Sequence, residues 1–350
     1  MTGTRAFMPV DAVGSTARWA EAQVVFDQLC QLDPERIRRR VSRLQQQRPA
    51  LGRCVRHLLA ADDAAVGPVR TPQVPGYRIA KQIGEGGMGA VYLAAAGADP
   101  VAIKVLKPGM DAVRFAVEKA TLAQLRHPNI ARLLAAGSLA DGRPYLVMEW
   151  VDGRPITERA GHVPIPVLLE RFQSLCQAVA CAHDRGVIHR DIKPANVLVS
   201  PQGEVKLLDF GIAKMLRPAF PGLAIDTRPE DRLLTPEYSS PEQLLGDPVT
   251  PGTDIYLLGL LLYELLAGAN PLAGLTARRR LRAMTRRREC VSPLTAAARG
   301  APLRTVRGWR RRRQLASLVL QALNVNPHHR PASARDLGDG VARLNPGVES

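Results

Sequence analysis

The chain has 350 residues, 46% of them hydrophobic, which is enough for one large two-lobed domain with a sizeable core and a small additional module. Its 5 cysteines are odd in number and show no C-x-x-C spacing, which argues against a disulfide framework and a zinc site and fits a reducing cytoplasm. The most apolar run, Ile255–Leu266, contains Glu264 and is too short to cross a bilayer. We therefore expect a buried helix there, with no signal peptide and no transmembrane segment.

The net charge of +16 comes from 48 Lys and Arg against 32 Asp and Glu, and the arginines concentrate at Arg36–Arg40 and Arg278–Arg313. A basic surface of this kind attracts nucleic acid, anionic lipid or acidic proteins. The simpler interpretation is that these arginines form a solvent-exposed surface, because charge alone does not identify a binding site.

Residues 1–60 are predicted to form a small helical module. Apolar side chains recur at helical spacing from Trp19 to Leu29, a second helix begins at Asp33-Pro34 and ends near Pro49, and a third runs from Leu51 to Leu59. Residues 61–75 are rich in proline and poor in large apolar groups, so they are predicted to be a linker.

From Tyr77 the pattern changes to short strands on either side of a glycine-rich turn. Gly84, Gly86 and Gly89 in this turn let backbone amides approach phosphate oxygens without interference from a Cβ atom. The same G-x-G-x-x-G spacing occurs in dinucleotide sites, where it follows one strand and opens a helix. Here Val91 and the residues after it continue as strand, which favours a hairpin.

The next strand, Val101–Lys104, places one lysine in a buried run, where the ammonium needs a partner. A helix is expected over Asp111–Leu125, and its Glu118 is a candidate partner for Lys104. The further expected elements are strands at Ala131–Gly137 and Arg143–Met148, a hinge at Glu149–Gly153, a helix at Pro164–Arg185, a strand at Val205–Leu208, and helices at Thr253–Gly268, Gln314–Leu323 and Ser333–Leu344.

The stretch Val187–Asn196 contains a carboxylate at Asp191, an ammonium at Lys193 and a carboxamide at Asn196 within six residues. Apolar residues lead into this stretch and a strand-like run follows it. A loop held at both ends can direct three polar side chains to one point. Downstream, the strand at Val205–Leu208 ends in Asp209-Phe210-Gly211.

Four motifs occur in the order seen in one family. They are the glycine-rich hairpin, His-Arg-Asp-Ile-Lys-Pro-Ala-Asn, Asp-Phe-Gly and Thr-Pro-Glu-Tyr-Ser-Ser-Pro-Glu-Gln. Together they resemble the eukaryotic-type, or Hanks-type, serine/threonine protein kinases, with wording similar to bacterial members, over roughly Tyr77–Leu344. The resemblance implies an α+β, two-lobed protein kinase fold across residues 76–345. Its small β-rich N-lobe would contain one key helix, and its larger C-lobe would be helical.

The resemblance also implies an ATP site formed by Ile83, Gly84, Glu85, Gly86, Gly87, Met88, Gly89, Val91, Ala102, Lys104, Glu118, Glu149, Val151 and Leu198. Lys104 would hold the α- and β-phosphates and be oriented by Glu118. The hinge backbone at Glu149 and Val151 would take the adenine, with Met148 behind it as gatekeeper.

For the reaction itself, the resemblance implies that Asp191 accepts the proton of the substrate hydroxyl or aims that hydroxyl, and that Lys193 neutralises the transferred phosphoryl group. Asn196, the third catalytic residue, would hold magnesium together with Asp209, and manganese is the alternative metal.

Several neighbouring residues are expected to have structural or regulatory roles. His189 is predicted to be a packed, hydrogen-bonded core histidine, Asp254 to cap its helix and tether the catalytic loop, and Glu242 to pair with Arg330. Two threonines carry the regulatory expectations. Thr227 is expected to be phosphorylated and to pair with Arg190, with acidic residues as the alternative anion, and Thr235 to hydrogen-bond Asp191 and Lys193.

The combined expectation is a cytoplasmic, non-specific serine/threonine protein kinase that transfers the ATP γ-phosphate to protein substrates and autophosphorylates. A catalytically weak kinase-like scaffold and a polyanion-binding signalling protein are the alternatives. A small-molecule phosphotransferase fits less well, because it lacks a segment such as Thr235–Glu242. The further partners considered are a second copy of the chain in a homodimer and a polyanion at Arg278–Arg313.

Overall fold

The computed structural model describes residues 25, 29, 34–48, 51 and 55 near the N-terminus, and then residues 71–86, 89–107, 122–158, 160–210, 237–275, 280, 302–306 and 308–345. The chain divides into two compact units, Met1–Pro72 and Gln73–Ser350.

The N-terminal unit contains helix α2 (Pro34–Gln47), which confirms the second predicted helix. Val25, Leu29, Leu51 and Val55 are also helical. Leu29, Leu51 and Val55 are buried together, and Val41 and Leu44 of α2 pack against them. The apolar positions that recur at helical spacing therefore meet in one small core.

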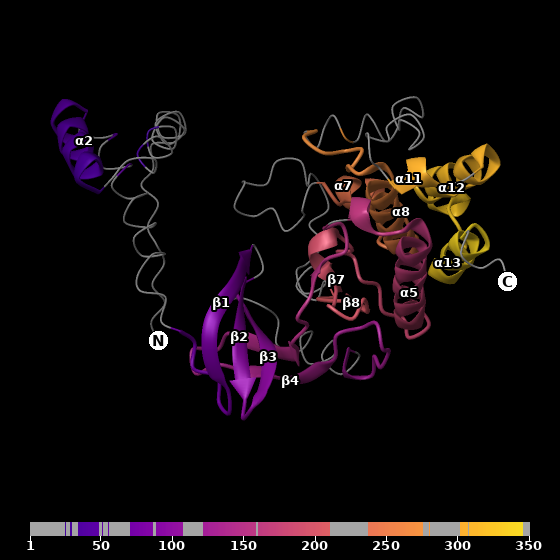
Figure 1. Ribbon diagram of the computed structural model, residues 1–350. Coiled ribbons are helices and arrows are strands. Elements are labelled where there is room, and N and C mark those ends of the chain that lie inside the picture. Colours follow the sequence, from indigo (N-terminus) through magenta and orange to yellow (C-terminus); the bar gives the residue numbers. More distant parts are fainter. Residues whose placement is uncertain are drawn as a thin grey trace. The chain divides into compact units, whose positions relative to one another are not determined.

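The second unit begins with a five-stranded antiparallel sheet in the order β1-β2-β3-β5-β4 (Figure 1). Its strands are β1 (Arg78–Gly86), β2 (Gly89–Ala96), β3 (Asp99–Leu106), β4 (Leu133–Ser138) and β5 (Pro144–Glu149). In the hairpin β1–β2, Gly84 lies opposite Val91 and Gly86 opposite Gly89. The predicted hairpin is confirmed, since the chain continues from the glycine-rich turn into a strand and not into a helix.

The alternation of β3 decides which of its side chains enter the core of this lobe. Val101, Ile103 and Val105 are buried in the apolar cluster of the sheet. Because side chains on a strand alternate between faces, Ala102 and Lys104 project from the opposite face. That face lines the cavity described below.

The other lobe is mostly helical, with the labelled helices grouped on one side of this unit in Figure 1. Its helices are α5 (Ile165–His183), α7 (Pro241–Leu245), α8 (Pro251–Ala267), α11 (Pro302–Thr305), α12 (Trp309–Ala322) and α13 (Ala334–Arg343). The 3-10 turns are η1 (Ala160–His162), η2 (Pro194–Asn196) and η4 (Pro327–His329), and the strands β6 (Arg154–Pro155), β7 (Val197–Val199) and β8 (Val205–Leu207) form a small sheet.

Helix α8 is the centre of this lobe. An ordinary surface helix exposes one side to solvent, yet every residue of α8 from Thr253 to Tyr263 is buried. Gly259 permits close packing, because a Cβ atom there would lie 2.8 Å from the Cβ of Ala322 on α12. The buried helix predicted at Ile255–Leu266 is thus confirmed.

The two-lobed α+β architecture is confirmed as well. Helix α12 begins at Trp309 and not at Gln314, because its first turn consists of tryptophan and arginines, which form helix readily but show no apolar periodicity. Within the described residues, the helices are all too short or too polar to cross a lipid bilayer. The helix predicted at Asp111–Leu125 lies mostly outside the described residues.

Candidate active site

A cavity of roughly 700 Å³ lies between the five-stranded sheet and the helical lobe. The predicted residues that line it are Ile83, Gly84, Glu85, Gly86, Gly89, Val91, Ala102, Lys104, Met148, Glu149, Val151, Asp191, Lys193, Asn196, Leu198 and Asp209. Gly87, Met88 and Glu118 lie outside the described residues. Ala131, Trp150, Gly153, Ala195 and Leu208 also line the cavity, although none was predicted as a ligand contact; Trp150 and Gly153 belong to the predicted hinge.

The three glycines of the hairpin differ in what the fold demands of them. Gly89 has φ +143°, and a Cβ atom there would lie 2.0 Å from the carbonyl oxygen of Val105, so β3 itself excludes a side chain. A Cβ atom on Gly86 would meet nothing within 4 Å, and one on Gly84 only an ordinary contact at 4.0 Å with Val91. The open cavity wall at Gly84 and Gly86 fits the close approach of a ligand.

Lys104 is 6% exposed and donates a hydrogen bond to Oδ2 of Asp209. Asp209 has φ +50°, an unusual backbone conformation for a residue other than glycine. Among the described residues, its second oxygen, Oδ1, is buried without a hydrogen-bond partner. A buried carboxylate oxygen without a partner is unfavourable, so it marks a position where a further positive group would be stabilising.

The predicted catalytic side chains converge in the turn η2 and the residues before it. Lys193 Nζ lies 2.9 Å from Oδ2 of Asp191, and Asn196 Nδ2 donates to the same oxygen at 3.0 Å. Asn196 Nδ2 also donates to the backbone carbonyl of Asp191 at 2.8 Å. The amide and the ammonium together hold the carboxylate of Asp191, which is 6% exposed, in one orientation.

His189 is buried and hydrogen-bonded as predicted. Its Nδ1 accepts the backbone N–H of Asp191 at 3.2 Å, so Nε2 bears the proton and donates to the carbonyl of Leu208 at 2.8 Å. Burial lowers the pKa of His189, although the nearby carboxylates of Asp254, Asp191 and Asp209 oppose that shift. The ring is therefore a neutral bridge between the catalytic loop and the strand that leads to Asp209.

Asp254 tethers the catalytic loop to α8. Its two oxygens accept the backbone N–H groups of His189 at 2.7 Å and Arg190 at 2.8 Å, and His183 Nε2 lies 2.8 Å from Oδ2. The predicted capping role is wrong, because Thr250 is the N-cap of α8 and Asp254 lies within its first turn. The carboxylate is fully buried, and both of its oxygens accept hydrogen bonds from the backbone of the catalytic loop.

The residues around Asp209 fit a divalent cation by their chemistry. Asn196 donates through its side-chain nitrogen to Asp191, so its side-chain oxygen is the atom that can act as a ligand, and Asp209 offers Oδ1, which has no hydrogen-bond partner among the described residues. Hard cations prefer such oxygen ligands. Asn196 and Asp209 would hold such a cation through these two oxygens. The described part of the chain contains no group of three or more His, Cys, Asp or Glu able to hold a metal.

The hinge after β5 combines a fixed side chain with an available backbone. Lys206 Nζ lies 2.7 Å from Oε1 of Glu149, and the backbone N–H of Arg132 donates to Oε2 at 3.2 Å. Burial by itself would raise the pKa of Glu149, but these partners outweigh it and hold that pKa below its ordinary value. Val151 lines the cavity and makes no backbone–backbone hydrogen bond within the described residues, which leaves its N–H and C=O available to a ligand.

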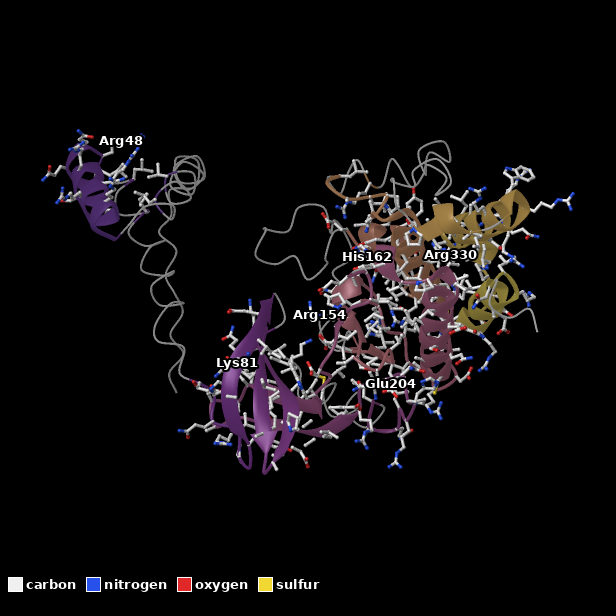
Figure 2. All side chains as sticks on the ribbon, in the orientation of Figure 1. Arg48, Lys81, Arg154, His162, Glu204 and Arg330 are labelled. Atoms are coloured by element: carbon white, nitrogen blue, oxygen red, sulfur yellow. The ribbon has the colours of Figure 1, made fainter. Side chains whose placement is uncertain are left out.

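Glu242 and Arg330 form the predicted ion pair, and both residues are buried. Arg330 is labelled in the helical lobe in Figure 2. NH1 of Arg330 donates to Oε1 at 2.8 Å and NH2 to Oε2 at 3.0 Å. Burial by itself would raise the pKa of Glu242, but the hydrogen bonds and charge of Arg330 outweigh it, and the pKa lies below its ordinary value. This pair anchors α7, the helix in which the Thr235–Glu242 segment ends. Thr227 and Thr235 lie outside the described residues.

Comparison with known proteins agrees with this geometry. Residues 77–338 match the model of the protein kinase domain. The chain is 38% identical over 216 residues to serine/threonine-protein kinase PknA of Mycobacterium tuberculosis, covering 57% of this chain and 48% of that protein. It is 36% identical over 282 residues to the serine/threonine-protein kinase pkn2 of Myxococcus xanthus, covering 76% of this chain and 32% of that protein.

A third relative, serine/threonine-protein kinase PknB of Mycobacterium leprae, is 33% identical over 291 residues, covering 77% of this chain and 43% of that protein. The chain thus spans about half or less of the length of these relatives. The crystal structure of the Mycobacterium tuberculosis PknI kinase domain superposes with a TM-score of 0.56 at 26% identity, covering 79% of this chain and 100% of that one. From the family match and the architecture together, the chain belongs to the protein kinase domain family.

Proposed function

We propose that this chain is a serine/threonine protein kinase that transfers the γ-phosphate of ATP to hydroxyl groups of protein substrates and of itself. The observation that carries the proposal is that two clusters of polar and charged side chains line one cavity. Asp191 is held by Lys193 and Asn196 on one side, and Lys104 is paired with Asp209 on the other. The similarity to bacterial kinases named for serine and threonine supports this choice of acceptor.

In this proposal the protein acts by positioning and electrostatics, since phosphoryl transfer asks little covalent chemistry of it. Asp191 orients the acceptor hydroxyl and takes its proton, while Lys193 neutralises charge on the transferred group. Lys104 binds the phosphates, and the backbone of Gly84 and Gly86 closes over them. The hinge backbone of Val151 holds the base of the nucleotide.

We propose Mg²⁺ as the metal, with Asn196 and Asp209 as its protein ligands, and Mn²⁺ as the alternative. A bound divalent cation supplies charge neutralisation for the phosphate oxygens. The roles of Glu118 as the orienting partner of Lys104, and of Gly87 and Met88 in covering the nucleotide, stay predictions.

The test is incubation of the full chain with ATP and Mg²⁺, followed by mapping of phosphosites by mass spectrometry. We expect phosphate on serine and threonine and none when EDTA removes the metal. Phosphate on tyrosine alone would contradict the proposed acceptor class. Full transfer in the presence of EDTA would contradict the proposed metal. The same maps test phosphorylation of Thr227.

A second candidate activity is contact with a polyanion through the start of α12. Trp309 is 61% exposed, and the guanidinium of Arg313 lies 5.3 Å from the centre of its ring. The first turn of α12 contains no acidic residue, so arginines lie at the positive end of the helix dipole. Positive charge at this end of α12 does not stabilise the helix. It suits a polyanion whose charged groups pair with the arginines and whose rings, where it has them, stack on Trp309.

Binding of single-stranded DNA and of anionic vesicles, measured as salt rises from about 50 to about 200 mM, tests this second activity, because counterion release weakens such contacts with salt. Trp309→Ala with Arg313→Gln should weaken binding, with Arg335→Gln on α13 as the control. No binding at low salt by the unmodified chain would contradict it.

Two smaller proposals remain. A homodimer would be detected by light scattering of the purified chain. A cytoplasmic location, where ATP is abundant, would be tested by cell fractionation.

A further inference from the structure

We propose that Gln243 is a positioning residue for catalysis, because it holds the peptide group that joins Arg190 to the catalytic Asp191. This inference rests on the proposed role of Asp191. Gln243 lies on α7, 53 residues further along the chain, and its Nε2 donates a hydrogen bond to the carbonyl oxygen of Arg190 at 2.8 Å. Gln243 is the last residue of the motif Thr-Pro-Glu-Tyr-Ser-Ser-Pro-Glu-Gln, but the motif alone does not indicate its contact with Arg190.

The orientation of the Gln243 amide is fixed from both ends. Oε1 accepts the backbone N–H of Ser240 at 3.0 Å, while Nε2 faces the Arg190 carbonyl. An exchange of the two amide atoms would place a donor against an N–H and an acceptor against a carbonyl. The side chain is therefore a rigid link between the start of α7 and the catalytic loop.

The link acts on a backbone that needs support. Arg190 has φ +66°, a left-handed conformation that is unfavourable for a residue with a side chain. The backbone N–H of Arg190 donates to Asp254 at 2.8 Å, and the backbone C=O of Arg190 accepts from Gln243. Conformations of this kind persist only where the surrounding structure over-determines them.

The same peptide plane sets the direction of the catalytic carboxylate. Its N–H, which belongs to Asp191, donates to Nδ1 of His189 at 3.2 Å, and its C=O accepts from Gln243. The plane is thus held on both edges. If the carbonyl loses its donor, the plane can rotate, and Asp191 moves relative to the acceptor hydroxyl. Small displacements of a catalytic group have large effects on rate.

Gln243 also connects this plane to the segment before α7. Ser240 caps α7 and belongs to the run Thr235–Glu242 that distinguishes protein kinases from small-molecule phosphotransferases in the sequence. Glu242, the neighbour of Gln243, is fixed by Arg330. The position of α7 is therefore transmitted to the catalytic loop through one side-chain amide.

The test compares Gln243→Glu and Gln243→Met with Ser240→Ala in the full chain. Gln243→Glu keeps the shape and the acceptor for Ser240 but removes the donor to Arg190, and Gln243→Met keeps the approximate length with neither. Ser240→Ala removes the reciprocal bond from the Gln243 backbone N–H to the Ser240 hydroxyl at 3.3 Å and leaves the Gln243 side chain in place.

We expect kcat to fall roughly tenfold in both Gln243 variants, with KM for ATP and affinity for ADP unchanged within about twofold. Ser240→Ala should keep kcat within about twofold of the unmodified chain. Equal kcat values in Gln243→Glu, Gln243→Met and the unmodified chain would overturn the inference. So would a matching loss of kcat in Ser240→Ala. If the unmodified chain transfers no phosphate, the proposed function itself fails, which is a distinguishable result.

Discussion

Replacement of Arg330 by methionine should destabilise the fold more than any surface substitution, because the guanidinium uses all five of its N–H donors. Two bind Glu242, and the others bind the backbone carbonyls of Asn324 at 2.7 Å, Gly252 at 2.8 Å and Val325 at 3.1 Å. The guanidinium also lies 5.0 Å from the ring centre of Tyr256.

The magnitude follows from what remains after the substitution. Arg330→Met leaves the Glu242 carboxylate buried, with a side chain 7% exposed and the Thr253 hydroxyl at 2.8 Å as its remaining described side-chain partner. Removal of one partner of a buried pair costs about 3–5 kcal/mol. Arg330→Lys keeps the charge but offers three donors in place of five, so we expect a loss of about 2 kcal/mol.

Equilibrium unfolding in urea measures these free energies, and Glu242→Gln completes a double-mutant cycle. The double variant should be less destabilised than the sum of the single variants, with a coupling of about 2 kcal/mol, because it leaves no unpaired charge. A loss below about 1 kcal/mol in Arg330→Met, or strict additivity in the cycle, would refute the reasoning.

The pH dependence gives a second signature of the same pair. The pKa of Glu242 is lowered in the folded chain, so the pair stabilises the fold above the ordinary glutamate value of 4.5 and this contribution is lost as pH falls through the folded-state pKa. The difference in stability between the unmodified chain and Arg330→Met should therefore narrow as pH falls below about 5. A constant difference from pH 7 to about pH 3 would contradict the assignment.

Three further predictions concern residues in or beside the site. Gly89→Ala should lower the free energy of unfolding by about 2 kcal/mol or more, and the melting temperature with it, through the clash with the Val105 carbonyl. Gly86→Val should leave stability nearly unchanged and raise KM for ATP roughly tenfold. The reverse pattern in thermal unfolding and steady-state kinetics would contradict the division of roles. Lys104→Ala should reduce nucleotide affinity and rate together, as calorimetry with ADP and kinase assays would show, with Lys81→Ala on β1 as the control. His189→Asn should reduce the loss of unfolding free energy that occurs as pH falls below 6.5. The pKa of His189 is lowered from its ordinary value of 6.5 in the folded chain, so its contribution to stability is present above pH 6.5 and is lost on acidification. That loss is at most about 1.4 kcal/mol per pH unit. If urea unfolding shows the same change in free energy between pH 7.5 and pH 5.5 for the variant and the unmodified chain, this role is excluded.

The sequence predicted those parts of the site that depend on local order. Residue spacing placed Asp191, Lys193 and Asn196 in one loop, and the apolar run around Lys104 indicated a strand whose lysine needs a partner. The hairpin was predictable because a strand, and not a helix, follows the glycines. The pairing of Glu242 with Arg330 came from the family resemblance, and the structure confirms it as a contact.

The remaining features depend on contacts between distant segments. Asp254 was expected to cap its helix because an acidic residue near a helix start commonly does so, but the packing of the catalytic loop against α8 gives its oxygens backbone N–H groups. The link from Gln243 to Arg190 and the pairing of Lys206 with Glu149 join residues 53 and 57 positions apart. No local pattern indicates such pairs, because both depend on how the elements fold back on one another.

The most direct test of the proposed function is phosphoryl transfer by Asp191→Ala, measured together with nucleotide affinity. Asp191 contacts Lys193 and Asn196 and serves the acceptor, while the nucleotide contacts assigned to Lys104, Val151 and the glycines are left in place. We predict that transfer to serine and threonine falls by at least about a thousandfold while the dissociation constant for ADP changes by less than about threefold. Transfer by Asp191→Ala at the rate of the unmodified chain would contradict the account.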